Sequence, residues 1–208
     1  MSSVPAILLI DPLNDFVHKD GKLYPAVKES IEASDSLANM KRLVDEARRL
    51  KIPIFYGLHQ PYKEGNYDGW RHMTKAHHGL KRLEAFKQGS WGGEIHSDLL
   101  PDAGNGDVVV SRHWNSSSFA NTDLDYQLKQ RGITHVICAG MVANTCLEAT
   151  ARFALELGYE VTLIKDATAG FSTELKDAAT EIVWPTLVES VLTVDQWAAE
   201  AKTKDASL

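Results

Sequence analysis

One cysteine occupies a position typical of a catalytic nucleophile. Cys146 follows an apolar run at residues 135–139 and a short turn at residues 140–145, and it falls in the first turn of a helical pattern. A thiol there lies near the positive end of the helix dipole, which favours the thiolate, and free N–H groups in the same turn can stabilise an oxyanion. Cys138, in the middle of the apolar run, is expected to be a buried, unreactive residue. These are the only two cysteines in the chain, which excludes a disulfide scaffold and favours a reducing compartment.

Ionisable groups follow two other apolar runs. Asp11 closes the run at residues 6–11, and Arg112 and His113 follow the run at residues 107–111. Taken alone, each of these groups reads as surface charge or a helix cap. Ligands of parallel sheets bind at the carboxyl ends of the strands, so a shared sheet edge would bring all three near Cys146.

Strands and helices alternate along the chain, which predicts a single α/β domain over residues 1–208. We expect a three-layer, doubly wound, mostly parallel sheet with helices on both faces. Apolar runs predict strands at residues 6–11, 52–58, 107–111, 135–139, 160–165 and 190–194. Helical periodicity predicts helices at residues 37–50, 124–131, 146–157 and 174–184. The Gly- and Trp-containing stretch at residues 60–93 reads as an irregular excursion that covers the pocket.

Composition narrows the classes of partner. The 208 residues carry a net charge of −6, with 44% apolar and 24% charged residues, which is typical of a folded soluble domain. The negative charge opposes binding to nucleic acid or acidic membranes, so a small-molecule partner is favoured. The longest apolar runs are far shorter than the ~20 residues that span a bilayer, and the first residues lack a basic region. We therefore expect a cytoplasmic protein.

Four segments together resemble the isochorismatase-like cysteine hydrolases. They are residues 6–16 (AILLIDPLNDF), 116–125 (SSSFANTDLD), 140–159 (GMVANTCLEATARFALELGY) and 165–169 (KDATA). That family includes nicotinamidases, N-carbamoyl amide hydrolases, ureidoacrylate hydrolases and isochorismatases. The resemblance implies a six-stranded, mostly parallel sheet flanked by helices, and a homo-oligomer, either a dimer or a tetramer.

The resemblance also assigns roles to residues. Cys146 matches the nucleophile that forms a thioester, and Asp11 matches the general base. The backbone amides of Val142 and Cys146 match the oxyanion hole, with a cis peptide bond expected at Met141–Val142.

Three aromatic residues and one cation complete the expected site. Phe16, Trp114 and Phe119 are expected to line an aromatic substrate pocket. The family's triad lysine has no counterpart, because no lysine lies between Lys87 and Lys129. Counting along the strand places Arg112 at that position, whereas counting back from the Ser118-Phe119 motif places His113 there. Arginine would stay charged at any working pH, and histidine would make the effect pH-dependent.

The sequence lacks the metal motif of nicotinamidases. Their Asp-x-His pair corresponds here to Gly57-Leu58-His59, without the carboxylate. His72, His77 and His78 lie on a polar segment and are expected to be solvated surface residues. We therefore predict no metal and no cofactor, which lowers the case for a nicotinamidase.

The leading prediction is a hydrolase that cleaves a C–N bond of a small amide, N-carbamoyl or imide substrate through a thioester. One alternative is an isochorismatase, which hydrolyses a vinyl ether and needs no cysteine nucleophile. Another is a catalytically silent binding protein that kept the fold after losing the lysine. The sequence does not identify the substrate.

Overall fold

Six strands form one parallel sheet at the centre of the molecule. The structure is a computed structural model that describes residues 3–205. The strand order is β3-β2-β1-β4-β5-β6, and every pairing between neighbours is parallel. The strands are β1 (Pro5–Ile10), β2 (Ile54–Gly57), β3 (Val108–Val109), β4 (His135–Met141), β5 (Glu160–Ala169) and β6 (Ser190–Leu192). The predicted α/β class is confirmed, and the sheet is wholly rather than mostly parallel.

The order of the strands places a switch point between β1 and β4. The chain builds outward from β1 through β2 to β3, then returns to β4 on the other side of β1 and builds outward through β5 to β6. Ile10, the last residue of β1, pairs with Gly140 near the end of β4. A crevice opens at the carboxyl edge of such a sheet where the strand order reverses, and this is where open α/β sheets bind ligands.

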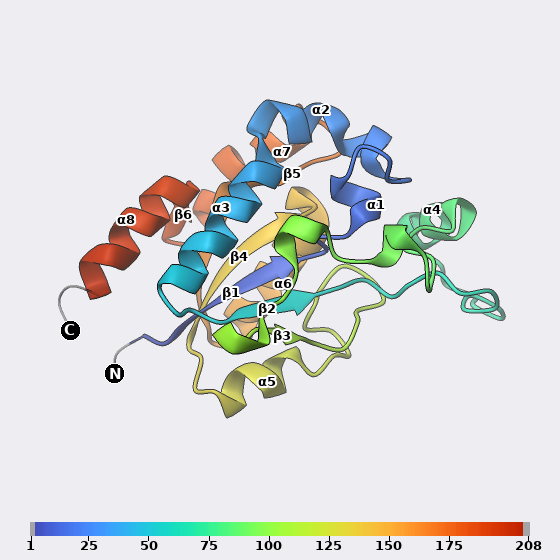
Figure 1. Cartoon of the computed structure of the whole chain (residues 1–208). Helices are drawn as coiled ribbons and strands as arrows, with labels where there is room; N and C mark the ends of the chain where they lie inside the picture. Colours follow the sequence, from blue (N-terminus) through green and yellow to red (C-terminus); the bar gives the residue numbers. More distant parts are fainter. Residues whose placement is uncertain (1–2, 206–208) are drawn as a thin grey trace.

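Helices cover both faces of the sheet (Figure 1). They are α1 (Asn14–Val17), α2 (Tyr24–Ser34), α3 (Ser36–Arg49), α4 (Lys75–Leu83), α5 (Leu124–Gln130), α6 (Glu148–Glu156), α7 (Thr173–Asp177) and α8 (Val194–Asp205). Two π-helical turns, η4 (Ala143–Leu147) and η5 (Ala178–Val183), precede or extend helices. Short 3₁₀ turns are η1 (Trp91–Gly93), η2 (Ser97–Leu99), η3 (Ala103–Asn105) and η6 (Trp184–Thr186). No helix in residues 3–205 is long and apolar enough to cross a membrane.

Side chains of β1 alternate between two apolar cores. Ile7 and Leu9 point into the core shared with α2, α3 and α8, whereas Leu8 and Ile10 point into the core shared with α5 and α6. All four side chains have no exposed surface, as expected for a central strand buried on both faces. The central strand is therefore rigid where its carboxyl end presents Asp11.

Besides the four-residue helix α1, three helices were not predicted from the sequence. In α2 the apolar pattern is weak, since only Val27 and Ile31 among its hydrophobic residues are buried. In α8, Val194 and Trp197 have helical spacing, and the prediction of a final strand reaching residue 194 obscured it. The third, α4, lies within the expected irregular excursion at residues 60–93 and at the opposite end of the molecule from α8 (Figure 1).

Candidate active site

Asp11 lies at the carboxyl end of β1 in a conformation that few residues adopt. Its φ is 47°, in the left-handed region, and its backbone N–H donates to the carbonyl of Gly57 at 2.9 Å. The side chain is fully buried, and its Oδ1 accepts a 2.6 Å hydrogen bond from the backbone N–H of His59. Strain held by surrounding hydrogen bonds is common at functional sites. The end of β2 thus holds the Asp11 carboxyl group in place.

His113 is the basic residue that contacts this carboxylate. Its Nε2 lies 3.3 Å from Oδ1 of Asp11, and both side chains are fully buried. Its Nδ1 lies 2.7 Å from the carbonyl oxygen of Asn115, so Nδ1 donates there and Nε2 faces Asp11. Burial alone would lower the pKa of His113, but the Asp11 charge raises it above its ordinary value. Burial likewise opposes ionisation of Asp11, but His113 and His59 bring the pKa of Asp11 below its ordinary value.

Arg112, the other candidate for this position, points elsewhere. One of its guanidinium nitrogens donates to the carbonyl of His59 at 2.9 Å, and its own carbonyl accepts from Gln60. The chain runs beside β2 here, with the N–H of His113 bonded to the carbonyl of Leu58. Neighbouring residues of extended chain face opposite sides, so only one of the pair can reach Asp11. Arg112 instead holds His59 in place, and the backbone N–H of His59 donates to Asp11.

Cys146 lies in η4, directly after β4, with its thiol lining the same cavity as Asp11. Burial and the negative charge of the nearby Asp11 carboxylate raise the pKa of the thiol well above its ordinary value, against smaller opposing contributions from Thr145 and the backbone of Val142. The expected thiolate at a helix start is therefore wrong for the resting protein. The regular helix α6 begins only at Glu148, and a carboxylate lies beside the sulfur. The resting side chain is a neutral thiol facing a base.

The turn that carries Cys146 is held closely against β1. Gly140 has a φ of 108°, and a Cβ there would lie 2.1 Å from the carbonyl oxygen of Ile10, so only glycine fits. The peptide bond between Met141 and Val142 is cis. The Thr150 hydroxyl donates to the Cys146 carbonyl at 2.7 Å, which ties the nucleophile to α6. These contacts set the position of the Val142 and Cys146 amides, the predicted oxyanion hole.

Asp11 and Cys146 open into a cavity of about 210 Å³. Its walls come from the chain just after β1, β2, β4 and β5, from α1 and the segment before α2, from α4 and the segment after it, and from the segment before α5. The lining residues are Asp11, Phe16, Leu23, His59, Ala76, Gly79, Leu80, Leu83, Phe86, Asn115, Ser116, Thr145, Cys146 and Phe171. The irregular excursion therefore covers the pocket, as the sequence predicted.

One of the three expected aromatic residues lines this cavity. Phe16 does so, and its ring packs 5.2 Å from that of Phe86. Phe119 does not: it lies in the core on the other face of the sheet, against Phe153 and Tyr159. Trp114 is also outside the lining, because its ring packs on Trp70, 5.3 Å away between centroids. The apolar residues of α4 were missed, although their spacing was a signal.

Two of the histidines considered as metal ligands, His59 and His77, are buried and make other contacts. His59 lines the cavity, and burial lowers its pKa to about 4, so its ring is neutral. His77 is buried rather than solvated, since its ring completes a capping box with Thr74 and lies 2.9 Å from the Trp114 carbonyl. His72 and His78 are exposed. Within residues 3–205, no group of three His, Cys, Asp or Glu residues is arranged to hold a metal ion.

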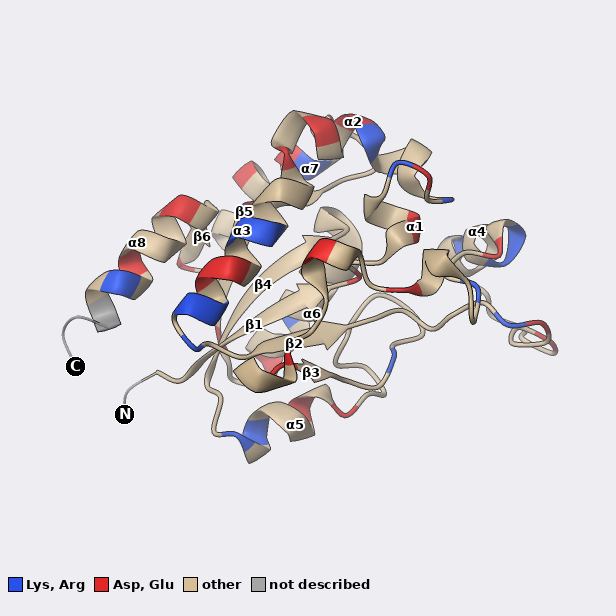
Figure 2. Cartoon of the chain, in the orientation of Figure 1, with Lys and Arg blue, Asp and Glu red and all other residues tan. Residues whose placement is uncertain are grey.

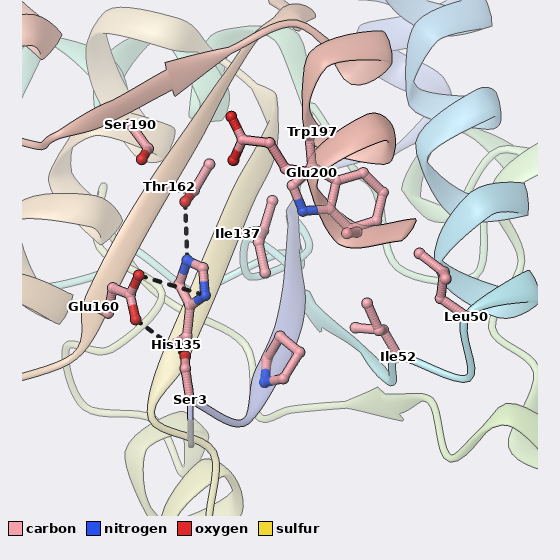
Figure 3. A pocket seen from close by; sticks show the side chains of 12 residues that line it. Ser3, Leu50, Ile52, His135, Ile137, Glu160, Thr162, Ser190, Trp197 and Glu200 are labelled. Atoms are coloured by element: carbon pink, nitrogen blue, oxygen red, sulfur yellow. Dashed lines mark hydrogen bonds and ion pairs between the residues drawn. The ribbon is translucent and has the colours of Figure 1, made fainter. Parts of the chain in front are cut away.

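A second cavity, of about 220 Å³, lies at the amino-terminal edge of the sheet (Figure 3). It is lined by His135 and Glu160 at the starts of β4 and β5 and by Trp197 and Glu200 of α8. His135 bonds to Thr162 at 2.9 Å. Neither cysteine lines this cavity, and ligands of parallel sheets bind at the opposite edge. The cavity at Cys146 is therefore the candidate active site.

The switch point of this parallel α/β sheet brings together a buried carboxylate, an imidazole and a cysteine thiol. This arrangement is that of a cysteine hydrolase. The chain belongs to the isochorismatase family, because the model of the Isochorismatase domain matches residues 5–196.

Curated relatives and solved structures agree with this assignment. The chain is 28% identical to the ureidoacrylate amidohydrolase RutB of Variovorax paradoxus, over 80% of this chain and 69% of that protein. It is 32% identical to the uncharacterized isochorismatase family protein YwoC of Bacillus subtilis, over 76% of this chain and 80% of that one.

Among solved structures, a cysteine hydrolase from Pseudomonas syringae pv. phaseolicola superposes with a TM-score of 0.79 at 22% identity, covering 96% of this chain and 93% of that one. The N-carbamoylsarcosine amidase from Thermoplasma acidophilum superposes with a TM-score of 0.65 at 25% identity, covering 92% and 96%.

Proposed function

We propose that this protein is a cysteine hydrolase that cleaves the C–N bond of a small amide, N-carbamoyl or imide substrate through a thioester intermediate. The observation that carries the proposal is that Asp11 and Cys146 line one cavity, where the carboxylate is near enough to raise the pKa of the thiol. Relatives named as a ureidoacrylate amidohydrolase and an N-carbamoylsarcosine amidase support the choice of a C–N bond.

Acylation begins with a neutral thiol and an ionised carboxylate. As Sγ of Cys146 attacks the substrate carbonyl carbon, Asp11 accepts the thiol proton, and the carbonyl oxygen becomes an oxyanion. The N–H groups of Val142 and Cys146 donate to that oxyanion. Asp11 then returns the proton to the departing nitrogen, the C–N bond breaks, and an amine or ammonia leaves.

Deacylation uses the same base. A water molecule attacks the thioester carbonyl carbon while Asp11 accepts a proton from that water, and the C–S bond then breaks. The proton goes to the leaving sulfur, which restores the thiol and releases the acid. Oδ1 of Asp11 is already engaged by His59 and His113, whereas Oδ2 makes no hydrogen bond of normal geometry within residues 3–205. Oδ2 is therefore the oxygen that shuttles the proton.

His113 acts through Asp11 rather than on the substrate. A protonated imidazole 3.3 Å away offsets the cost of burying the carboxylate and keeps it ionised. It is absent from the cavity lining, so it is a positioning residue. This role corresponds to that of the lysine in the family's triad, which the chain lacks.

Trapping the acyl-enzyme tests the proposal. A panel of primary amides, N-carbamoyl compounds and cyclic imides is screened for ammonia or acid release, and the best substrate is quenched in acid for intact-mass analysis. We expect a mass increase equal to the acyl group, located on Cys146. Cys146→Ala should lose turnover and the adduct, while Cys138→Ala, at a buried strand position, should keep both. Full activity in Cys146→Ala would overturn the proposal.

Two finer expectations stay predictions. Cytoplasmic location rests on the absence of apolar spans and the cysteine content of the sequence. A dimer or tetramer is expected from the family resemblance. Light scattering after size-exclusion chromatography measures the oligomeric state directly.

A further inference from the structure

Helix α4 presents an apolar stripe to the candidate active site. Ala76, Gly79, Leu80 and Leu83 follow the i, i+3, i+4, i+7 spacing that places side chains on one helix face, and all four line the cavity that contains Cys146. Leu83 leaves 38% of its surface exposed. Covering apolar surface of this kind with a ligand is favourable, because the surface is removed from water.

The position of this wall is fixed by contacts at both ends of the helix. At its start, Thr74 and His77 form a capping box, and His77 Nε2 lies 2.9 Å from the Trp114 carbonyl. After its end, the N–H of Phe86 donates to the buried Asp15 carboxylate at 2.6 Å. The stripe is therefore a preformed part of the cavity.

The other walls add apolar surface and no positive charge. Phe16, Leu23 and Phe86 are buried, and Phe171 lies at the rim, 45% exposed. Among the described residues that line the cavity, none is Lys or Arg, and His59 is neutral because its pKa is lowered to about 4.

The basic residues of α4 add no positive charge to the cavity lining. Lys75, Lys81 and Arg82 are exposed, away from the cavity lining, and Figure 2 shows basic segments along this helix. A substrate carboxylate would lose its hydration in the cavity without gaining a cation, and it would lie near the Asp11 charge.

We propose that the substrate is an uncharged amide with an apolar acyl group that packs against α4, and that Gly79 determines how large this group can be. The inference rests on the proposed function and adds the substrate class. Gly79 lines the cavity, and a Cβ built on it meets no atom within 4 Å, so the space beside it is open. A side chain introduced there occupies substrate volume.

A series of substrates tests the charge and size of the acyl group. kcat/KM is measured for straight-chain primary amides from acetamide to octanamide, each paired with the analogue that ends in a carboxylate. For the uncharged series we expect a rise of about fourfold for each added methylene until the cavity is full. Each carboxylate analogue should fall at least tenfold below its uncharged partner. Equal or better turnover of the carboxylates would overturn the inference.

Substitutions at Gly79 test the specificity determinant. Gly79→Leu should lower kcat/KM for the longer amides at least tenfold and leave acetamide within about threefold of wild type. Gly79→Ala, which fits with little change, should shorten the preferred chain by about one methylene. His78→Leu, on the exposed side of the same helix, should leave the whole profile unchanged. A Gly79→Leu profile identical to wild type would remove Gly79 from this role.

The failure of this inference is distinguishable from failure of the proposed function. An enzyme that loses activity in Cys146→Ala but prefers carboxylate substrates keeps the function and loses the inference. An enzyme that keeps full activity in Cys146→Ala loses the function whatever its preference for acyl groups.

Discussion

Nε2 of His113 lies 3.3 Å from Oδ1 of Asp11, and neither side chain has any exposed surface. The pair is nearly isolated from solvent, so each charge depends on the other. The pKa of His113 is raised and that of Asp11 is lowered, so each group stabilises the charged form of the other.

The first prediction concerns the alkaline side of the pH–activity profile. Activity should fall as the pH rises through the raised pKa of His113, which lies above the ordinary value of about 6.5. Deprotonated His113 no longer stabilises the negative charge of the Asp11 carboxylate. The pKa of the Cys146 thiol is raised, so this thiol does not lose its proton at a lower pH than an ordinary cysteine. His113→Lys should move the alkaline fall upward. An unchanged profile in this variant would show that another group causes it.

The same pair should make stability depend on pH. The contribution of His113 is complete below its unfolded-state pKa of about 6.5 and is lost as the pH rises through its raised folded-state pKa. The contribution of Asp11 is complete above about 3.9 and is lost as the pH falls through its lowered folded-state pKa. Urea unfolding of wild type and His113→Gln should therefore differ most between about pH 4 and 6.5. His72→Gln, at an exposed position, should track wild type.

Asp11→Asn should lower kcat by about 10² to 10⁴, because an amide cannot accept the thiol proton. It should also lower the pKa of Cys146, since the carboxylate that raises it is gone. Alkylation of Cys146 by iodoacetamide, followed as a function of pH, measures this shift. The neutral resting thiol predicts slow alkylation of the wild type near pH 7. A higher thiol pKa in Asp11→Asn would show that the carboxylate does not raise the pKa of Cys146.

Gly140→Ala should unfold or strongly destabilise the protein, by more than about 3 kcal/mol. Its Cβ would lie 2.1 Å from the Ile10 carbonyl oxygen and would force apart the two central strands below the site. Gly158→Ala is the matched control: its φ of 87° is also positive, but nothing lies within 4 Å of the added Cβ. The free energy of unfolding of that variant should fall by only about 1–2 kcal/mol, which is the cost of the left-handed conformation for a residue with a Cβ. Equal losses in urea unfolding would show that close approach is not the cause.

Asp15→Ala should weaken substrate binding without removing a reacting group. Its carboxylate accepts from the N–H groups of Phe86, at 2.6 Å, and Lys22, at 3.0 Å, and the variant leaves both donors without their partner. We expect the free energy of unfolding to fall by about 1–3 kcal/mol for the buried Phe86 donor and by less for the more exposed Lys22 donor. Because Phe86 lines the cavity, KM should rise more than kcat falls. Asp20→Ala, at an exposed position, is the control and should leave both constants unchanged. A loss confined to kcat would place Asp15 in the chemistry instead.

Much of the fold was predictable because its strands are strongly apolar. β1 and β4 have no exposed side chains, and their runs were recognised within two residues of their observed ends. β3 is only Val108–Val109, at the sheet edge, where fewer contacts favour a longer strand. The helix predicted from residue 146 begins instead with the π-helical turn η4, which local periodicity does not distinguish from a regular helix start.

The sequence by itself determined which groups are available and at which edge of the sheet they meet. Apolar strands followed by Asp11 and Cys146, in a strand-helix order that requires parallel pairing, place both groups beside the switch point. Only the tertiary structure decided that His113 rather than Arg112 contacts Asp11, and that Phe119 packs away from the cavity. Each of these depends on which side of the backbone a residue faces, and a shift of one residue reverses it. The neutral state of the Cys146 thiol was likewise a tertiary outcome, because burial and a carboxylate from a distant strand outweigh the local helix dipole.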